Sequence, residues 1–187
     1  MSRHYKLLLA SSLLVNLGDN LIGPLWAVFV QGIGGTILVL GYAAAISSFV
    51  TGFAIIAVGK LSDHMDKTVL TFIGYILFAL GTLGYLIISE PWHLYLLQIV
   101  FGLGGALLAA PLTALFARYI NKESEGFQWS LGDGGGRLMV GVAVLSGAFI
   151  VNAFGFTALF LTMFAIQALA IVVYFRFFLL VRQTAQR

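Results

Sequence analysis

The first apolar stretch of this 187-residue chain contains three polar side chains at helical spacing. Asn16, Asp19 and Asn20 lie three and four residues apart, so a helix places them on one broad face. Such side chains can tie a helix to its neighbours through hydrogen bonds. However, a carboxylate inside a membrane is costly and usually faces a water-filled cavity. We therefore assign these three residues to a polar pathway for a solute or a proton.

A second pair of charges, Asp133 and Arg137, lies four residues apart in a later apolar stretch. Two pairings are open. If Arg137 pairs with Asp133 alone, Asp19 is free to bind a cationic solute or a proton. If Arg137 pairs with Asp19, which lies at a similar depth in its own helix, an anionic substrate or a proton can compete for the pair. We expect the second pairing, because it gives both charges a function, and we assign Asp133 and Arg137 to the pathway.

The composition excludes an ordinary soluble domain. Hydrophobic residues make up 60% of the chain, charged residues only 9%, and the mean hydropathy is +1.02. The ten basic residues are therefore interpreted as topology signals, and no nucleic-acid partner is expected. The chain contains no cysteine, and its three histidines lie at the ends of apolar stretches. We predict no enzyme activity, no cofactor and no metal site, since neither a protease constellation nor clustered metal ligands lie within the apolar stretches.

Six apolar stretches are each near the ~20 residues that a helix needs to cross a bilayer. They predict an all-α, polytopic protein that forms a single domain over residues 1–187, with transmembrane helices at about 7–30, 37–59, 68–88, 92–117, 127–151 and 156–178. The loops at 31–36, 89–91 and 152–155 contain no Lys or Arg. By the positive-inside rule, both termini are expected in the cytoplasm. We expect the chain to be an integral protein of the inner (cell) membrane.

An internal repeat supports this arrangement. Gly18 followed by Pro24-Leu25 recurs as Gly105 followed by Pro111-Leu112 with the same offset. The first span thus corresponds to the fourth, and an odd number of spans between them makes the two copies run in opposite directions. We predict a three-plus-three inverted repeat with units of about 1–90 and 91–187.

The most charged stretch, residues 59–70, connects the second and third spans. It resembles the loop motif G-x-L-x-D-R-x-G-R-K of the major facilitator superfamily (MFS). The matching residues are Gly59, Leu61, Asp63 and Lys67, whereas His64, Asp66 and Thr68 differ from the motif. The resemblance implies a gating loop. We expect Asp63 to cap the following helix and to engage Arg118 at the end of the fourth span.

The resemblance continues in the fourth span, where residues 98–106 look like the family's R-x-x-x-G-x-G motif with Gln98 in place of Arg. We assign Gln98 and Trp26 to the solute pathway. The fifth span contains a cluster of glycines that favours close helix packing, either between two halves of a transporter or at a bending point: Gly134, Gly135, Gly136 and Gly141.

Taken together, the resemblance implies one six-helix, N-terminal-like half of an MFS transporter. Such a half would move a small organic solute across the lipid bilayer by alternating access, as in efflux, with protons as a candidate coupling ion. One half cannot enclose a pathway, so we expect a parallel homodimer or a second transporter half, with Gly134, Gly135 and Gly141 near the interface. The alternative is a truncated or accessory half that packs against a partner without transporting by itself.

Overall fold

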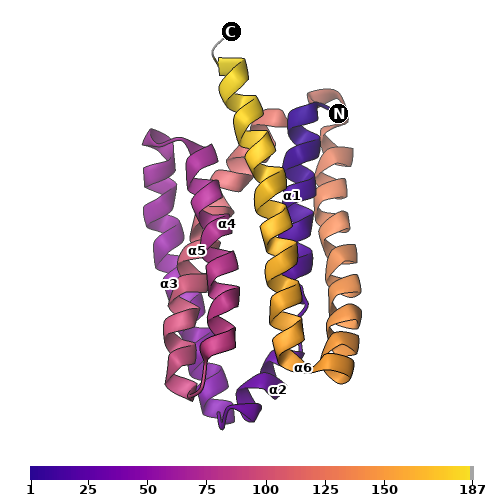
Figure 1. Cartoon of the computed structure of the whole chain (residues 1–187). Coiled ribbons are helices and arrows are strands. Elements are labelled where there is room, and N and C mark those ends of the chain that lie inside the picture. The colour runs from indigo at the N-terminus through magenta and orange to yellow at the C-terminus, as the bar shows by residue number, and fades with distance from the viewer. Residues whose placement is uncertain (186–187) are drawn as a thin grey trace.

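The computed structural model describes residues 1–185, and within them the chain is helical with no β-strand. Figure 1 shows the long helices side by side, with the N-terminus and the last described helical turn at the same end of the bundle. The helices are α1 (Arg3–Asn20), α2 (Leu25–Gly32), α3 (Ile37–His64), α4 (Lys67–Gly84), α5 (Pro91–Tyr119) and α6 (Glu125–Ala185), with short 3-10 turns η1 (Tyr85–Ile87) and η2 (Lys122–Ser124).

The first span is broken in the middle. Helices α1 and α2 meet at an angle of 46° across a break of four residues. Pro24 stands directly before α2. Proline has no N–H group and its ring clashes with the preceding turn, which favours a break, and Gly23 directly before it has a positive φ of 26° that a regular helix does not contain. The break leaves the end of α1 and the start of α2 facing the interior of the bundle from two directions.

Helix α6 is a hairpin of two arms. Its 61 residues follow helical geometry except at Gly155, where φ is 80° and ψ is 179°. A side chain is strongly disfavoured at this φ, so glycine allows the reversal. In Figure 1 the two arms run antiparallel, and the reversal lies at the end of the bundle opposite to the termini.

Four of the helices, namely α3, α4, α5 and α6, are long and apolar enough to cross a membrane, and the bent pair α1 and α2 makes a fifth if it counts as one span. The predicted all-α membrane architecture is thereby confirmed.

Packing between the helices follows a simple order. Helix α1 lies along α6, α3 lies along α5, and α4 contacts both α5 and α6. At Gly147 of α6, an added Cβ would collide with the carbonyl oxygen of Leu21, the residue that directly follows α1. Leu21 belongs to an apolar cluster with Phe29, Tyr85 and Phe160 that surrounds the break between α1 and α2.

Two helices present a largely unburied surface. In α3, only Ala43 and Ser62 are buried, and Phe53 is 74% exposed. The first arm of α6 exposes Leu138 and Leu145 to 70% and 76%. These apolar faces need lipid or another protein unit to cover them.

The connection between α3 and α4 is shorter than the sequence suggested. Helix α3 continues to His64 and α4 begins at Lys67, so most of the expected loop at 59–70 is helical. Consequently Asp66, and not Asp63, caps α4: its side chain accepts a hydrogen bond from the backbone N–H of Thr68 at 2.9 Å. The extra turn of α3 places Asp63 before the reversal, out of reach of the free N–H groups of α4.

Candidate functional site

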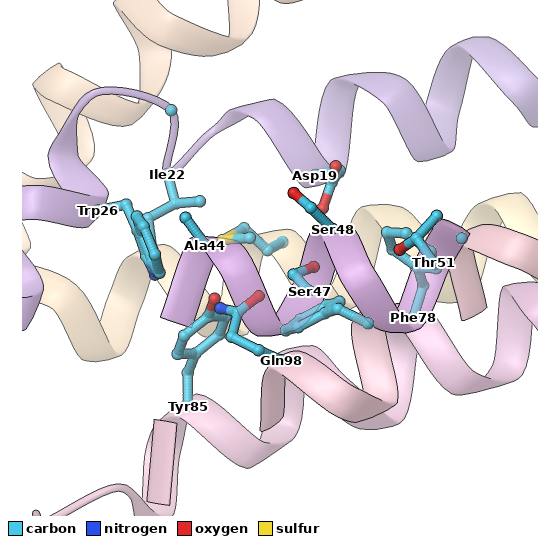
Figure 2. A pocket seen from close by; sticks show the side chains of 14 residues that line it. Asp19, Ile22, Trp26, Ala44, Ser47, Ser48, Thr51, Phe78, Tyr85 and Gln98 are labelled. Atoms are coloured by element: carbon cyan, nitrogen blue, oxygen red, sulfur yellow. The ribbon is translucent and has the colours of Figure 1, made fainter. Parts of the chain in front are cut away.

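A cavity of about 460 Å³ lies beside the break between α1 and α2. We call it the larger cavity. Figure 2 shows Asp19 entering it from α1, with Tyr85 and Gln98 entering from the opposite side. The other side chains that line it include Ile22, Trp26, Ala44, Ser47, Ser48, Thr51, Phe78, Phe101 and Met163.

The carboxylate of Asp19 is the one anionic group of the larger cavity. Within residues 1–185 it has no hydrogen-bond or ion-pair partner that belongs to the protein. The walls around it combine aromatic rings with the hydroxyl groups of Ser47 and Ser48. An anion next to aromatic faces is suited to bind a cation, because both attract positive charge.

A smaller cavity, of about 230 Å³, shares Asp19 with the larger one. Its lining includes Asn16 and Asn20, so the structure brings together the three polar residues of α1 that the sequence grouped. The side-chain nitrogen of Asn20 donates to the backbone oxygen of Asn16 at 2.8 Å. The side-chain oxygen of Asn16 is buried without a partner among the described residues, so it can accept a hydrogen bond from a molecule in this cavity.

Sequence reasoning missed Tyr85. Its ring stacks on Phe160 with centroids 4.9 Å apart and meets the ring of Phe29 edge-on at 5.6 Å. These contacts fix the tyrosine at the wall of the larger cavity. An isolated tyrosine near the end of an apolar stretch carries no signal of this role in the sequence.

The hydroxyl groups on α3 were also missed. Ser47, Ser48 and Thr51 line the larger cavity, and Thr51 donates a hydrogen bond to the backbone oxygen of Gly102 at 3.3 Å. Their spacing of one, three and four residues places them on one face of a helix, which is a signal that could have identified them.

Asp133 and Arg137 lie outside both cavities. Arg137 Nε donates to Asp133 Oδ2 at 3.3 Å, and the two side chains are 80% and 75% exposed. This pairing corrects the expected pair between Arg137 and Asp19. The spacing of four residues keeps both charges on one face of α6, which points away from the bundle, whereas Asp19 points into it.

The four glycines that the sequence assigned to helix packing divide into two pairs. A Cβ at Gly135 would lie 3.3 Å from Leu13 of α1, and one at Gly136 would lie 3.9 Å from Asn16. At Gly134 and Gly141 a Cβ would meet no atom within 4 Å. Gly135 therefore packs against α1 of its own chain, which corrects its expected place at a subunit interface.

The ion pair at the turn between α3 and α4 also differs from the expected one. Asp63 is exposed, and Arg118 lies over the ring of Tyr119 at 5.6 Å, whereas Arg182 Nη2 approaches Asp66 Oδ2 at 3.1 Å. Lys67 Nζ donates to the backbone oxygen of Ser62 at 2.6 Å. The predicted contact between Asp63 and Arg118 is thus replaced by the pair of Arg182 with Asp66. Of the remaining matches to the loop motif, Gly59 and Leu61 lie within α3.

Two effects oppose each other at Asp66. Partial burial alone would raise its pKa. Hydrogen bonds from the side chain and backbone of Thr68, together with the positive charge of Arg182, outweigh burial and lower the pKa of the Asp66 carboxyl. The turn is therefore held by an ionised carboxylate.

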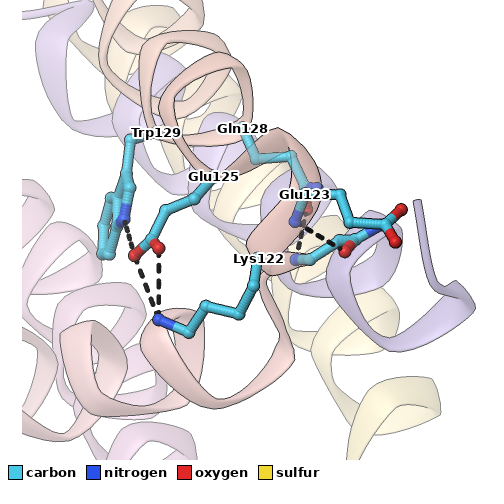
Figure 3. Close-up of polar contacts among 6 residues, drawn as sticks. Lys122, Glu123, Glu125, Gln128 and Trp129 are labelled. Atoms are coloured by element: carbon cyan, nitrogen blue, oxygen red, sulfur yellow. Dashed lines mark hydrogen bonds and ion pairs between the residues drawn. The ribbon is translucent and has the colours of Figure 1, made fainter.

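The turn between α5 and α6 is closed by a polar cluster that Figure 3 shows. Lys122 pairs with Glu125 at 3.2 Å, and the side-chain nitrogen of Gln128 donates to Ser124 at 2.7 Å. The backbone oxygen of Gln128 also accepts a hydrogen bond from the hydroxyl of Tyr5 at 2.6 Å. These contacts tie the start of α6 to α1 and give the turn a structural role. Elsewhere in residues 1–185, no group of three His, Asp or Glu side chains is arranged to hold a metal ion.

Comparison with known proteins identifies relatives of the chain. Residues 8–187 match the family described as the Major Facilitator Superfamily. The chain is 34% identical over 125 residues to the "Multidrug resistance protein MdtH" of Photorhabdus laumondii, a match that covers 66% of this chain and 31% of the relative. Proteins of the same description from Cronobacter sakazakii and Yersinia pestis are 30% and 32% identical over the same shares. The match thus spans about a third of the length of these relatives.

Proposed function

Since this chain belongs to the Major Facilitator Superfamily, we propose that it forms one six-helix wall of a transporter that moves an organic cation past Asp19. The family membership confirms the predicted resemblance, and it supports the prediction that the chain is part of a membrane transport protein rather than an enzyme. The solute, the number of spans and the assembly are the subjects of the proposal.

Six spans result if the bent pair α1 and α2 counts as one and α6 as two, divided at Gly155. The proposed inverted repeat rests on the sequence match of Gly18 and Pro24 with Gly105 and Pro111. The N-terminus, the last described turn of α6 and the turns before α4 and α6 lie at one end of the bundle (Figure 1). Because basic residues are concentrated at that end, we propose that it faces the cytoplasm from the inner membrane.

The observation that carries the proposal is the carboxylate of Asp19, which faces the larger cavity without a protein partner. Because Arg137 is neutralised by Asp133, Asp19 keeps its negative charge available for a ligand. An organic cation would pair with the carboxylate and place its hydrocarbon groups against Trp26 and Tyr85. A proton can replace the cation on the same carboxylate, which would couple proton movement to transport. The description of the relatives as multidrug resistance proteins supports a varied class of solutes and the direction of efflux.

A single copy leaves this pathway without its second wall. Ala44 and Ser48 of α3 line the larger cavity and are exposed, and the first arm of α6 carries exposed apolar side chains. We propose that a second six-helix unit, from a parallel homodimer or from another transporter half, covers these faces. Gly134 and Gly141 leave room for a close approach of that unit.

Binding of tetraphenylphosphonium to the purified protein in lipid nanodiscs tests the role of Asp19. We expect Asp19→Asn to weaken binding at least about tenfold, which corresponds to ~1.4 kcal/mol, while Asp133→Asn binds like the wild type. Both changes remove one negative charge from the chain, so the second is a matched control. Equal binding by Asp19→Asn and the wild type would contradict the proposal.

Disulfide cross-linking tests the second wall, because the chain has no natural cysteine. We expect Gly141→Cys to cross-link between two copies in the membrane if the unit is a homodimer, and Gly135→Cys, which faces α1, not to do so. If neither position cross-links and the mass in lipid is that of a monomer, the homodimer is wrong. Uptake of the cation by vesicles that contain this chain alone would then separate a transporter from an accessory half.

A further inference from the structure

A third cleft, of about 320 Å³, lies far from Asp19, between the start of α1 and the last turns of α6. Its lining comes from two ends of the chain: Arg3, Leu7, Arg176, Leu179, Leu180 and Gln183. None of these residues lines the larger or the smaller cavity, so the cleft has no part in the proposed cation pathway.

The cleft contains two cations and no anion. Arg3 and Arg176 are both exposed, and in residues 1–185 no carboxylate lies within 4.0 Å of either guanidinium group. Arg182, which stands six residues beyond Arg176 and thus ~9 Å further along the helix, differs because Asp66 neutralises it. Two like charges that share one cleft repel each other unless an anion from outside the chain lies between them.

The remaining lining is apolar and faces outward. Leu179 is 44% exposed, and Leu7 and Leu180 are partly buried beside it. Arg176 lies near the end of the last apolar stretch, where the membrane core meets the headgroup layer. A small free anion would contact the arginines and leave the apolar surface of the leucines uncovered. A molecule with an anionic head and hydrocarbon chains would occupy both parts of the cleft.

We propose that this cleft binds the headgroup of an anionic phospholipid in the leaflet next to the two chain termini. The guanidinium groups of Arg3 and Arg176 hold the phosphate, since the planar fork of arginine matches phosphate oxygens. The amide of Gln183 donates a further hydrogen bond, and an acyl chain lies along Leu7 and Leu179. The lipid removes the repulsion between the two arginines and joins the first helix to the last.

Native mass spectrometry of the full chain with defined lipids tests this proposal. The probes are phosphatidylglycerol, which is anionic, and phosphatidylcholine of the same acyl chains, which is zwitterionic. We expect the wild type to retain phosphatidylglycerol preferentially. Each single variant, Arg3→Gln or Arg176→Gln, should weaken this binding about fivefold, and the double variant should weaken it further.

The matched control is the double variant Lys6→Gln/Lys60→Gln, which removes two charges at the same end of the bundle but outside the cleft. We expect it to retain phosphatidylglycerol like the wild type. Equal losses in the two double variants, or equal retention of both lipids by the wild type, would overturn the proposal. Displacement of the lipid by millimolar inorganic phosphate would show a phosphate site instead. If the double variant does not fold, Arg3→Gln decides, because this residue stands at the very start of α1.

Discussion

The larger cavity and the turn between α3 and α4 use polar residues in opposite ways. At the turn, Asp66 accepts hydrogen bonds from Thr68 and pairs with Arg182, while Lys67 bonds to Ser62. In the cavity, the carboxylate of Asp19 faces open space without a protein partner. The shape of the turn therefore depends on polar contacts. The shape of the cavity depends instead on apolar packing around Leu21 and Tyr85, and its carboxylate remains free for a ligand.

This difference separates residues that stabilise the fold from residues that serve function. Partnered polar groups contribute to stability, whereas unpartnered ones reduce it and persist at sites that bind something. The contrast predicts that changes at the contacts around the cavity and at the turn reduce stability. The removal of the free carboxylate is expected to reduce binding alone.

The largest effect on stability is expected at Gly147. Because a side chain there would collide with the carbonyl oxygen of Leu21, Gly147→Leu must push α1 away from α6 and should destabilise the protein by about 3 kcal/mol. Thermal unfolding in detergent, followed by circular dichroism, measures this. The control Gly141→Leu introduces the same side chain into open space and should change stability little. Equal effects at both positions would show that the contact of Gly147 with Leu21 does not stabilise the helices around the cavity.

The turn should be more sensitive to Asp66 than to Asp63. Asp66→Ala removes the cap of α4 and the partner of Arg182, and we expect a loss of about 1.5 kcal/mol, mostly from the cap because the ion pair is partly exposed. Asp63→Ala should change stability by less than about 0.5 kcal/mol. If Asp63→Ala lowers stability more than Asp66→Ala does, the motif residue Asp63 stabilises the turn, and the assignment to Asp66 is wrong.

The pH dependence follows from the lowered pKa of Asp66. The native state favours the ionised carboxyl, so the contribution of Asp66 to stability is fully present above the pKa of an Asp carboxyl in the unfolded chain, which is about 3.9. This contribution is lost as the pH falls through the lower pKa that Asp66 has in the folded state. The difference in stability between the wild type and Asp66→Ala should therefore shrink below about pH 4. A difference that stays constant down to pH 2 would show that the charge is not involved.

Asp19→Asn should separate stability from binding. An uncompensated carboxylate in the bundle is costly, so its neutralisation should leave the melting temperature unchanged or raise stability by up to about 1 kcal/mol, while cation binding is weakened. The same thermal unfolding experiment, with tetraphenylphosphonium absent and then present, measures both. The ligand should raise the melting temperature of the wild type and not that of the variant. A variant that unfolds easily even without ligand would place Asp19 among the stabilising residues.

How far the sequence predicted this structure depends on the range of each interaction. The apolar stretches and the spacing of Asn16, Asp19 and Asn20 follow from local periodicity, and the motif residues near Asp63 identified the family. The role of Tyr85 depends on Phe29 and Phe160, which are distant in sequence, so no local pattern revealed it. The capping residue was misassigned because the end of α3 lies several residues later than the apolar stretch suggests.

The smallest effect is expected at Arg137, whose pairing distinguishes the two hypotheses from the sequence. An exposed pair at a spacing of four residues contributes little in water, so Arg137→Gln should change stability by less than about 0.5 kcal/mol. If Arg137 and Asp19 were a buried pair, each single change would destabilise strongly and the double change would restore stability. A double-mutant cycle of Arg137→Gln with Asp19→Asn measures this coupling. The structure predicts a coupling near zero, since Asp19 faces the cavity and Arg137 faces outward with Asp133. A coupling above about 1 kcal/mol would mean that α6 turns its charges inward in another state of the transport cycle.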